Sequence, residues 1–365
     1  MAASLLHRIE AIANVDVDDA RTDLIKGVPF TTHNQTSNQG IITTSLLDDP
    51  ALLKDLVLKH GSLGWENVYN HAAVLLCARN VRLLSGRVLV QTSLRHVHSR
   101  PAILAQCREY ARLFAAAGIP ADRFAIKLPM SGAAAAAARE LNAEGIRTLA
   151  TAVFSFEQAV AASQSDCLFI SPYYNEIMAH LDRSRHVSYQ DTALENPMSC
   201  RVVQMLDFFA REHARTGKPQ PIMVIASFLT SAEVLAMVEL GCPHITIPAN
   251  LIQELLSTPD TLPPLSSPKP PAAALHTGCP PAPRLAGLLA KDPLAGPGWS
   301  TSALVSAEQT DFVADGGAAL DTFLARDPVA KERFAQAERF FLEQEECARV
   351  AIEEEMAASG VQVLK

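Results

Sequence analysis

Eight short apolar segments in the first 250 residues constrain the fold of this chain most strongly. We expect them to be β-strands, and they lie at 15–18, 35–38, 88–92, 124–128, 148–152, 168–171, 222–227 and 244–248. Helix-forming stretches lie between several of them, at 102–117, 132–144, 156–163, 199–213, 231–240 and 250–256. Because the strands are too apolar to leave one face in water, they indicate a parallel sheet covered by helices. Eight such units favour a closed (β/α)8 barrel, the TIM-barrel architecture of the α/β class.

An open doubly wound sheet is the alternative, but no G-x-G-x-x-G motif follows an early strand. Residues 257–300 hold 11 of the 23 prolines, so we expect an irregular or mobile insertion without regular elements there. Helical periodicity returns at 318–356, which predicts extra C-terminal helices within 301–365. We therefore expect residues 1–365 to form a single barrel domain that carries this insertion and these helices.

The overall composition excludes several classes of partner. Hydrophobic residues make up 48% of the chain and charged residues 19%, as in a globular protein with a large core. The net charge of −8 comes without a cluster of lysines and arginines, so we expect neither nucleic acid nor an anionic membrane as a partner. The N-terminal segment lacks the long apolar core of a secretory signal, and we expect a cytosolic protein.

Neither the cysteines nor the acidic clusters suggest a metal site. The seven cysteines are scattered and contain no C-x-x-C pair, so we expect reduced thiols. The glutamates at 343–346 and 353–355 are expected on a solvated helix face. We expect no metal and no organic cofactor.

Lys127 is the most unusual residue of the predicted strands, because it interrupts the apolar segment RFAIKLPMSG. A lysine is almost never buried without a partner or a chemical role. Burial disfavours the ammonium form, and a free amine can attack a carbonyl group to form a Schiff base. A lysine that extends out to solvent or pairs with a carboxylate remains the alternative.

Other polar residues stand at neighbouring strand ends, where a barrel gathers its reactive groups. Asp16 and Asp18 end the first strand on one face, because strand side chains alternate. The second strand closes with Asn38, and the sixth with Ser171 and Tyr173. Each of these strand-end residues, taken singly, is also compatible with a turn or a helix cap. An acid beside the Lys127 amine, however, is suited to general acid or base catalysis.

Five segments resemble successive strand signatures of the transaldolases, class I Schiff-base enzymes on a (β/α)8 barrel: AIKLP, GIRTLATAVFSFEQA, FISPYY, VIASF and ITIPANLIQEL. The segments come in the family's order and near its spacing, from Asn14 to the C-terminal helices, and only the proline-rich insertion departs. The resemblance implies a Schiff-base lysine, a catalytic aspartate, a substrate-binding asparagine, a water-holding threonine and two substrate-contacting serines, which fall on Lys127, Asp18, Asn38, Thr151, Ser171 and Ser227. Asp16 competes for the aspartate role, but Asp18 lies closer to the strand end.

Two departures from the family concern proton transfer. Gln91 stands where transaldolases have a glutamate, and Tyr173 where they have a phenylalanine. This pair resembles the related fructose-6-phosphate aldolases, in which a tyrosine holds the water. Because an amide cannot titrate and a phenol both donates and accepts, we expect Tyr173 to serve as the acid or base.

Three further departures concern the substrate. Glu176 and Leu229 replace the arginines that bind the sugar phosphate, and Leu149 replaces an asparagine that contacts substrate hydroxyls. A carboxylate repels a phosphate and leucine offers no hydrogen-bond donor. We therefore expect an unphosphorylated substrate, which is either less polar than a sugar phosphate or carries a positive charge. Arg183 and Arg185 are alternative phosphate ligands, unless they are ordinary surface residues.

Three functions follow from these residues. The first is aldol-type chemistry on a small, unphosphorylated carbonyl compound, in a specialised biosynthetic role. The second is transfer of a dihydroxyacetone unit between sugar phosphates by a true transaldolase, and the third is a decayed barrel that only binds. Association into a homo-oligomer stays open, because such barrel faces have no readable motif.

Overall fold

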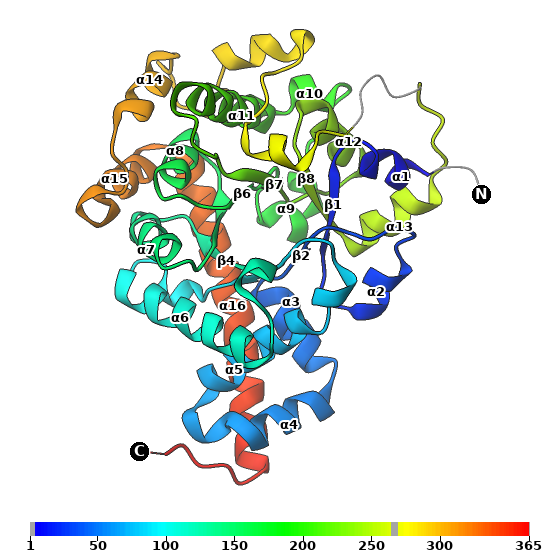
Figure 1. Ribbon diagram of the computed structural model, residues 1–365, viewed down its shortest axis with the longest axis vertical. Helices are drawn as coiled ribbons and strands as arrows, with labels where there is room; N and C mark the ends of the chain where they lie inside the picture. Colours follow the sequence, from blue (N-terminus) through cyan, green and yellow to red (C-terminus); the bar gives the residue numbers. More distant parts are fainter. Residues whose placement is uncertain (1–3, 264–268, 365) are drawn as a thin grey trace.

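Eight parallel strands close into a ring. The computed structural model describes residues 4–263 and 269–364. Its strands are β1 (Asn14–Asp18), β2 (Gln35–Thr36), β3 (Val88–Gln91), β4 (Phe124–Pro129), β5 (Thr148–Val153), β6 (Phe169–Pro172), β7 (Ile222–Ile225) and β8 (His244–Pro248). They pair in sequence order, and β1 pairs with β8 to close the barrel. The (β/α)8 barrel predicted from the sequence is therefore confirmed (Figure 1).

Helices surround this ring. The predicted ones are present as α6 (Arg100–Ala116), α7 (Gly132–Ala143), α8 (Phe156–Gln164), α11 (Pro197–Thr216), α12 (Ser231–Leu240) and α13 (Ala249–Ser257). Helix α1 (Leu5–Glu10) precedes the first strand. The sequence pattern missed α2 (Thr22–Gly27), α3 (Gln39–Leu47), α4 (Pro50–His60), α5 (Trp65–Ala78), α9 (Met178–Leu181) and α10 (Thr192–Glu195). α3 has the sequence QGIITTSLL, whose β-branched residues have low helix propensity, and packing against other helices decides its conformation.

Short polar side chains begin the helices that follow the strands. Thr230 caps α12: its Oγ1 accepts from the Glu233 backbone nitrogen at 3.3 Å, within a capping box. Asn38 caps α3 in the same way, because its Oδ1 accepts from the Ile41 nitrogen at 3.1 Å. These caps fix the point at which each loop turns away from the barrel mouth.

The described part of the proline-rich insertion packs on the barrel. It forms two short 3-10 helices, η6 (Ala272–His276) and η7 (Pro283–Ala290), so the expectation of no regular element is wrong there. Proline is tolerated in the first turn of a short helix, and η7 has Pro283 at that position. Leu285 and Leu288 are buried, and η7 lies against α11. The part of that expectation that falls on 264–268 lies outside the described residues.

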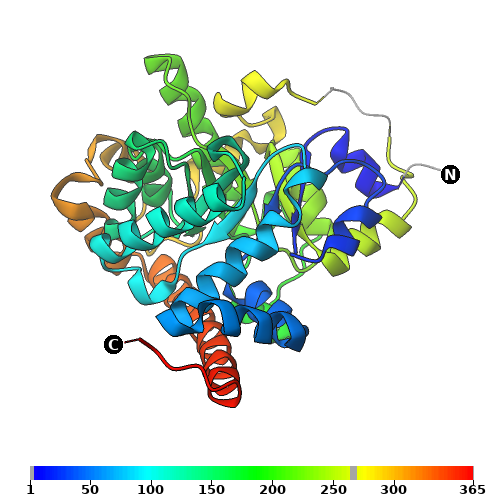
Figure 2. The same ribbon diagram turned by 60° about the horizontal axis from the view of Figure 1, so that its bottom comes forward.

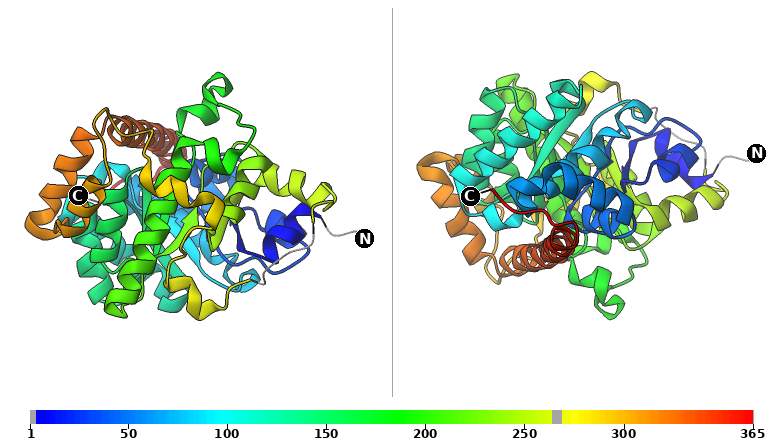
Figure 3. Two further views of the ribbon diagram at one scale, coloured as in Figure 1. Left: turned by 90° about the horizontal axis from the view of Figure 1, so that it is seen from above. Right: turned by 90° about the horizontal axis from the view of Figure 1, so that it is seen from below.

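The C-terminal region is helical, as predicted. It consists of α14 (Ser302–Gln309), a 3-10 turn η8 (Ala314–Gly317), α15 (Ala318–Arg326) and the long α16 (Pro328–Ala358). α16 follows the long axis of the molecule, and its C-terminal end projects beyond the barrel (Figures 1 and 2). Helices α3, α4 and α5 pack against it, and Figure 3 shows them beside it from below. No helix in the described ranges combines the length and the apolarity needed to span a bilayer.

One expected surface glutamate is buried. Glu353 and Glu354 are exposed, as predicted for the surface of α16. Glu345 was expected on the same solvated face, but it is only 2% exposed and accepts a hydrogen bond from Ser93 Oγ at 2.7 Å. The prediction was wrong because the turn after β3 and helix α5 cover this side of α16.

Arg201 of α11 joins four segments of the chain. This side chain is 1% exposed, and its Nε donates to both oxygens of Asp292 at 2.9 and 3.1 Å. One terminal nitrogen donates to Asp327 at 2.7 Å, and the other to the Phe154 carbonyl at 2.6 Å. Asp327 is the N-cap of α16. Arg201 therefore fastens the insertion and the start of α16 to the loop that follows β5.

Replacing Arg201 should destabilise the fold strongly. Arg201→Met leaves two carboxylates without their buried cation, and we expect the free energy of unfolding to fall by about 3–5 kcal/mol in urea denaturation. The matched control is Arg215→Met on the same helix, where an exposed arginine pairs with Glu212. We expect that change to cost at most about 0.5 kcal/mol. Equal effects of the two changes would contradict the role of Arg201.

Candidate active site

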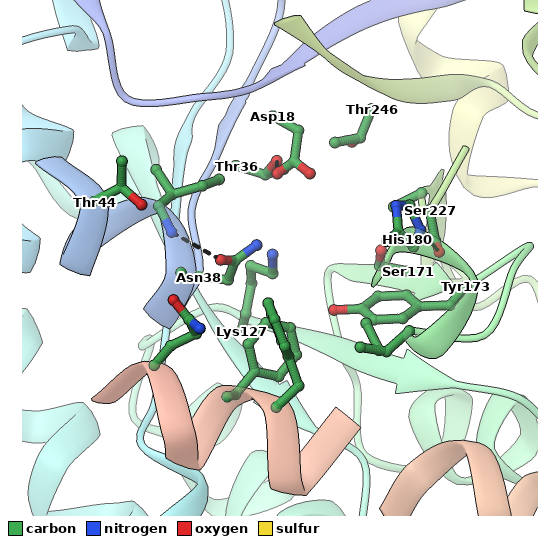
Figure 4. Close-up of a pocket in the computed structure, with 17 residues that line it drawn as sticks. Asp18, Thr36, Asn38, Thr44, Lys127, Ser171, Tyr173, His180, Ser227 and Thr246 are labelled. Carbon is green, nitrogen blue, oxygen red and sulfur yellow. Dashed lines mark hydrogen bonds between the residues drawn. The ribbon is translucent and has the colours of Figure 1, made fainter. Parts of the chain in front are cut away.

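A pocket of about 340 Å³ opens at the carboxyl ends of the strands. Its apolar wall includes Ile177 and two α16 residues, Phe340 and Phe341. Its polar lining comes from nine elements or the loops beside them (Figure 4) and consists of Asp18, Thr36, Asn38, Thr44, Lys127, Ser171, Tyr173, His180, Ser227, Thr246 and Gln344. The strand ends therefore bring six of the predicted site residues into one cavity.

Lys127 is the only lysine or arginine among the described residues that line this pocket. It is 4% exposed, and its Nζ donates to the Ser37 carbonyl at 3.0 Å. Burial lowers the pKa of this amine, while the nearby Asp18 and Cys77 act in the opposite direction. Desolvation prevails, because few groups replace the water that an ammonium ion needs. The amine is thus easier to deprotonate than an exposed lysine.

Asp18 is the pocket carboxylate, and Asp16 is not. Asp18 Oδ1 accepts from Thr36 Oγ1 at 2.5 Å. Burial raises the pKa of Asp18, although Lys127 and Thr36 oppose this. Asp16 lies deeper, where it accepts from the Asn34 backbone at 2.8 Å and contacts His244 Nδ1 at 3.1 Å. Those bonds occupy Asp16 inside the barrel and leave Asp18 to face the amine.

Tyr173 and Thr151 form a buried hydroxyl pair. Thr151 Oγ1 donates to the Tyr173 phenol oxygen at 3.2 Å. Tyr173 is 5% exposed, and burial raises the pKa of its phenol, so the group keeps its proton. Because the phenol accepts from Thr151, its own hydrogen is free to be donated into the pocket. In Figure 4 the phenol oxygen points into the cavity that Lys127 also enters.

Gln91 lies next to Lys127 in the strand register but outside the pocket lining. Its Nε2 donates to Gln39 Oε1 at 2.6 Å, which fixes the orientation of the amide. Its Oε1 is buried and has no hydrogen-bond partner among the described residues. This oxygen can accept a hydrogen bond but cannot take a proton.

Asn38 and Ser171 each offer a polar group to the cavity. The Asn38 carbonyl oxygen is used as the cap of α3, which leaves its amide nitrogen beside the Lys127 amine (Figure 4). Ser171 is 3% exposed, lines the pocket and makes no side-chain hydrogen bond within the described part of the chain. Both groups are free to bind hydroxyls of a ligand.

His180 is a pocket residue that sequence reasoning missed. Ser227 Oγ donates to the Asn175 carbonyl at 2.9 Å, so it accepts from His180 Nε2 at 2.8 Å. Burial lowers the pKa of His180 to about 4, and the imidazole is neutral near pH 7. Ser227 has a φ of +72°, a strained conformation that this bonding helps to hold. No local motif marks His180, because it enters the pocket from the short helix α9.

Thr246 and the α16 residues were also missed. Thr246 alternates with Ile245 and Ile247 in β8, and this alternation was an available signal for an inward hydroxyl. Its buried Oγ1 has no partner in the described ranges. Gln344 and the two phenylalanines of α16 carry no such signal, since only tertiary packing brings that helix to the mouth.

Three predicted substrate residues do not line the pocket. The Glu176 carboxylate receives both Arg185 donors at 2.9 and 3.0 Å and Gln336 Nε2 at 2.7 Å. Burial opposes ionisation of Glu176, but these bonds lower the pKa of its carboxyl overall. Leu229 is buried, and its carbonyl accepts from Arg183 at 3.3 Å. Leu149 packs in an apolar cluster inside the barrel.

The fold and this pocket define a closed α/β barrel with a desolvated lysine at its mouth. The chain belongs to the transaldolase and fructose-6-phosphate aldolase family, whose model, described as Transaldolase/Fructose-6-phosphate aldolase, matches residues 15–277. A transaldolase of Shewanella amazonensis is 28% identical over 193 residues, which are 53% of this chain and 58% of the relative. The transaldolase of Sus scrofa is 31% identical over 56% of this chain and 58% of its own. That of Aeromonas salmonicida is 26% identical over 70% and 80%, respectively.

The matches to the first relatives are partial in length. This chain spans 58% of both the Shewanella amazonensis and the Sus scrofa proteins. The family follows instead from the family model, which matches residues 15–277.

Removing the Asp18 charge should lower the pKa of Lys127. In Asp18→Asn the carboxylate no longer favours the ammonium, so the amine loses its proton at lower pH. Acetylation by acetic anhydride is measured as a function of pH by mass spectrometry of the Lys127 peptide. Its midpoint is the pH at which half of the amine has lost its proton. Exposed Lys54 in the same sample serves as the reference for the reagent. A midpoint that is unchanged or moves to higher pH would contradict the coupling.

Proposed function

We propose that this protein is a class I aldolase-type enzyme that makes or breaks a C–C bond through a Schiff base on Lys127. The buried amine carries this proposal, because burial favours the free base that attacks a carbonyl carbon. An acid and a phenol from other strands lie in the same cavity. Membership of the transaldolase family supports the reaction class.

The reaction follows from the chemistry of an amine in this setting. The Lys127 nitrogen adds to the carbonyl carbon of the substrate, and loss of water from the adduct gives an iminium ion. The iminium accepts the electron pair of the adjacent C–C bond, while a proton leaves the hydroxyl on the far carbon. An aldehyde departs and an enamine remains on the lysine. Proton addition and hydrolysis release the product, and addition to a second aldehyde forms a new C–C bond.

The surrounding residues divide the proton transfers. In the addition direction the phenol of Tyr173 donates its proton to the oxygen of the incoming aldehyde, with Thr151 holding the phenol oxygen. In cleavage the Asp18 carboxylate accepts the proton of the hydroxyl on the far carbon. Asp18, whose pKa is raised, then returns this proton to the enamine, at the carbon next to the one attached to the lysine. Gln91 orients a water molecule through its free carbonyl oxygen. Asn38, Ser171 and Ser227 hold the hydroxyl groups of the substrate.

The charges at the mouth favour an unphosphorylated substrate. A phosphate dianion needs a guanidinium or several donors close by. Lys127 is the only cationic side chain among the described lining residues, and it is the reacting group. Arg185 is bound to Glu176 through two hydrogen bonds. The neutral His180 and the hydroxyls of Ser227 and Thr246 instead suit a polyhydroxylated, uncharged carbonyl compound.

A true transaldolase acting on sugar phosphates is the second candidate. The observation in its favour is Arg183, whose guanidinium makes one bond of 3.3 Å to the Leu229 carbonyl and otherwise remains exposed beside His180. The third candidate is a barrel that only binds. The buried amine argues against it, because binding alone would need no free amine in the pocket.

Trapping with borohydride tests the Schiff base directly. Incubation with dihydroxyacetone and other small aldehydes and ketones, followed by reduction, should place a stable adduct on the Lys127 peptide in mass spectrometry. Lys127→Met should lose the adduct completely, whereas Lys59→Met, which changes an exposed lysine, should keep it. Absence of an adduct across the whole carbonyl panel would favour the barrel that only binds.

The phosphate preference separates the two enzymatic candidates. We expect kcat/KM for fructose 6-phosphate to be no higher than that for fructose, because no arginine of the lining binds the phosphate. A dedicated charged pair, worth about 1.5–3 kcal/mol per hydrogen bond, would raise it about 10- to 100-fold or more. A preference of that size that disappears in Arg183→Ala would establish the transaldolase reading instead.

A further inference from the structure

A second cavity, of about 330 Å³, lies outside the barrel mouth. Helices α5 and α6 and the turn after β3 form its walls, and α16 closes it with Glu345. None of its described lining residues also lines the mouth pocket. The neighbouring α16 residue, Gln344, lines the mouth pocket, so adjacent residues of this helix border the two cavities.

The lining of this cavity is acidic. Three carboxylates take part, from Glu66, Glu109 and Glu345, and no lysine or arginine does within the described ranges. Arg112 neutralises Glu109 through two hydrogen bonds of 2.7 and 2.8 Å. Glu66 has no such partner among the described residues. Glu345 contacts Arg95 at 3.6 Å, so the unpaired negative charge of the described wall comes from Glu66, and it favours a cation.

Two buried side chains of the wall, Glu345 and Tyr69, each keep an oxygen with open hydrogen-bonding capacity. Glu345 is 2% exposed, and its contacts with Ser93 at 2.7 Å and Arg95 at 3.6 Å both involve Oε2. No described residue donates to Oε1. Tyr69 is also 2% exposed, and its phenol makes no hydrogen bond to any described residue. Both residues line the cavity, so a ligand there could use this open hydrogen-bonding capacity.

Other polar groups of the same wall are already satisfied. Gln106 accepts from the Ser93 nitrogen at 2.9 Å and donates to Asn70 at 3.1 Å. The open hydrogen-bonding capacity is thus concentrated on Tyr69 and Glu345, beside the indole of Trp65. The guanidinium of Arg95 already stacks on that ring, 5.3 Å from its centroid, and aromatic faces attract cations of this kind.

A metal ion does not fit this arrangement. The described residues contain no group of three histidine, cysteine or acidic side chains that converge as metal ligands. A single open carboxylate oxygen, a phenol and an indole instead match an ammonium or guanidinium group attached to a short apolar chain.

We propose that the cavity between α5, α6 and α16 binds a small organic cation. Its ammonium or guanidinium group donates to Glu345 Oε1 and to the Tyr69 oxygen, and its apolar part lies against Trp65. This site is independent of the Schiff-base chemistry and goes beyond the function proposed above.

Trp65 provides the readout for a binding test. The chain has two tryptophans, so Trp299→Phe leaves Trp65 as the only one. In this background, n-butylammonium and n-butylguanidinium are titrated to about 20 mM, above the millimolar dissociation constants that ligands of this size reach. We expect a saturable change in Trp65 emission with at least one cation and none with neutral n-butanol. No saturable change with either cation, or an equal response to butanol, would overturn the proposal.

Variants locate the binding groups. Glu345→Gln should weaken binding of the cation about tenfold or more, because a charge-assisted bond is lost. Glu343→Gln is the matched control, since Glu343 is exposed on the same helix outside the cavity. Tyr69→Phe removes only a hydroxyl without a partner, so the fold should be kept while affinity falls severalfold. If both Glu345→Gln and Tyr69→Phe bind the cation as tightly as the parent protein, with folding verified by circular dichroism, the proposal is also overturned.

Discussion

Exclusion of water from the Lys127 amine is the constraint on which the site depends. The amine sits in the fourth strand of a closed ring, and α16 forms part of the pocket wall. An ammonium ion loses its hydration there, so its pKa falls. The position of α16 rests on Arg201, which binds its N-cap Asp327, and on Gln336, which binds Glu176 beyond the mouth. Contacts away from the amine therefore help to hold the wall that keeps water from it.

The contacts that hold α16 also explain the charge at the mouth. Glu176 occupies the position of a phosphate-binding arginine in the family resemblance, yet its carboxylate faces Arg185 and Gln336 and not the pocket. Glu176 thus gives α16 an anchor, while the loss of a phosphate ligand at this position stays a prediction. Adjacent residues of helix α16 also line the reaction pocket and the acidic cavity at Glu345.

Residue patterns predicted much of this molecule. All eight strands were located within a few residues, because buried parallel strands leave continuous apolar segments between polar turns. Lys127, Asp18 and Tyr173 were singled out by their places at strand ends, and the structure brings them into one pocket. Helix α3 escaped detection because its conformation depends on packing, and Glu345 was misplaced because its covering segments are distant in sequence.

The sequence by itself determined the barrel, the buried lysine and the chemistry of the strand ends, since these depend on local period and on the cost of burying a charge. Only the tertiary structure decided which carboxylate faces the amine, because Asp16 and Asp18 have equal local patterns and differ in the partners that His244 and Asn34 provide. It also decided that His180 and α16 enter the mouth, and that Glu176 leaves it. Those outcomes depend on contacts between residues far apart in the chain, which no local pattern encodes.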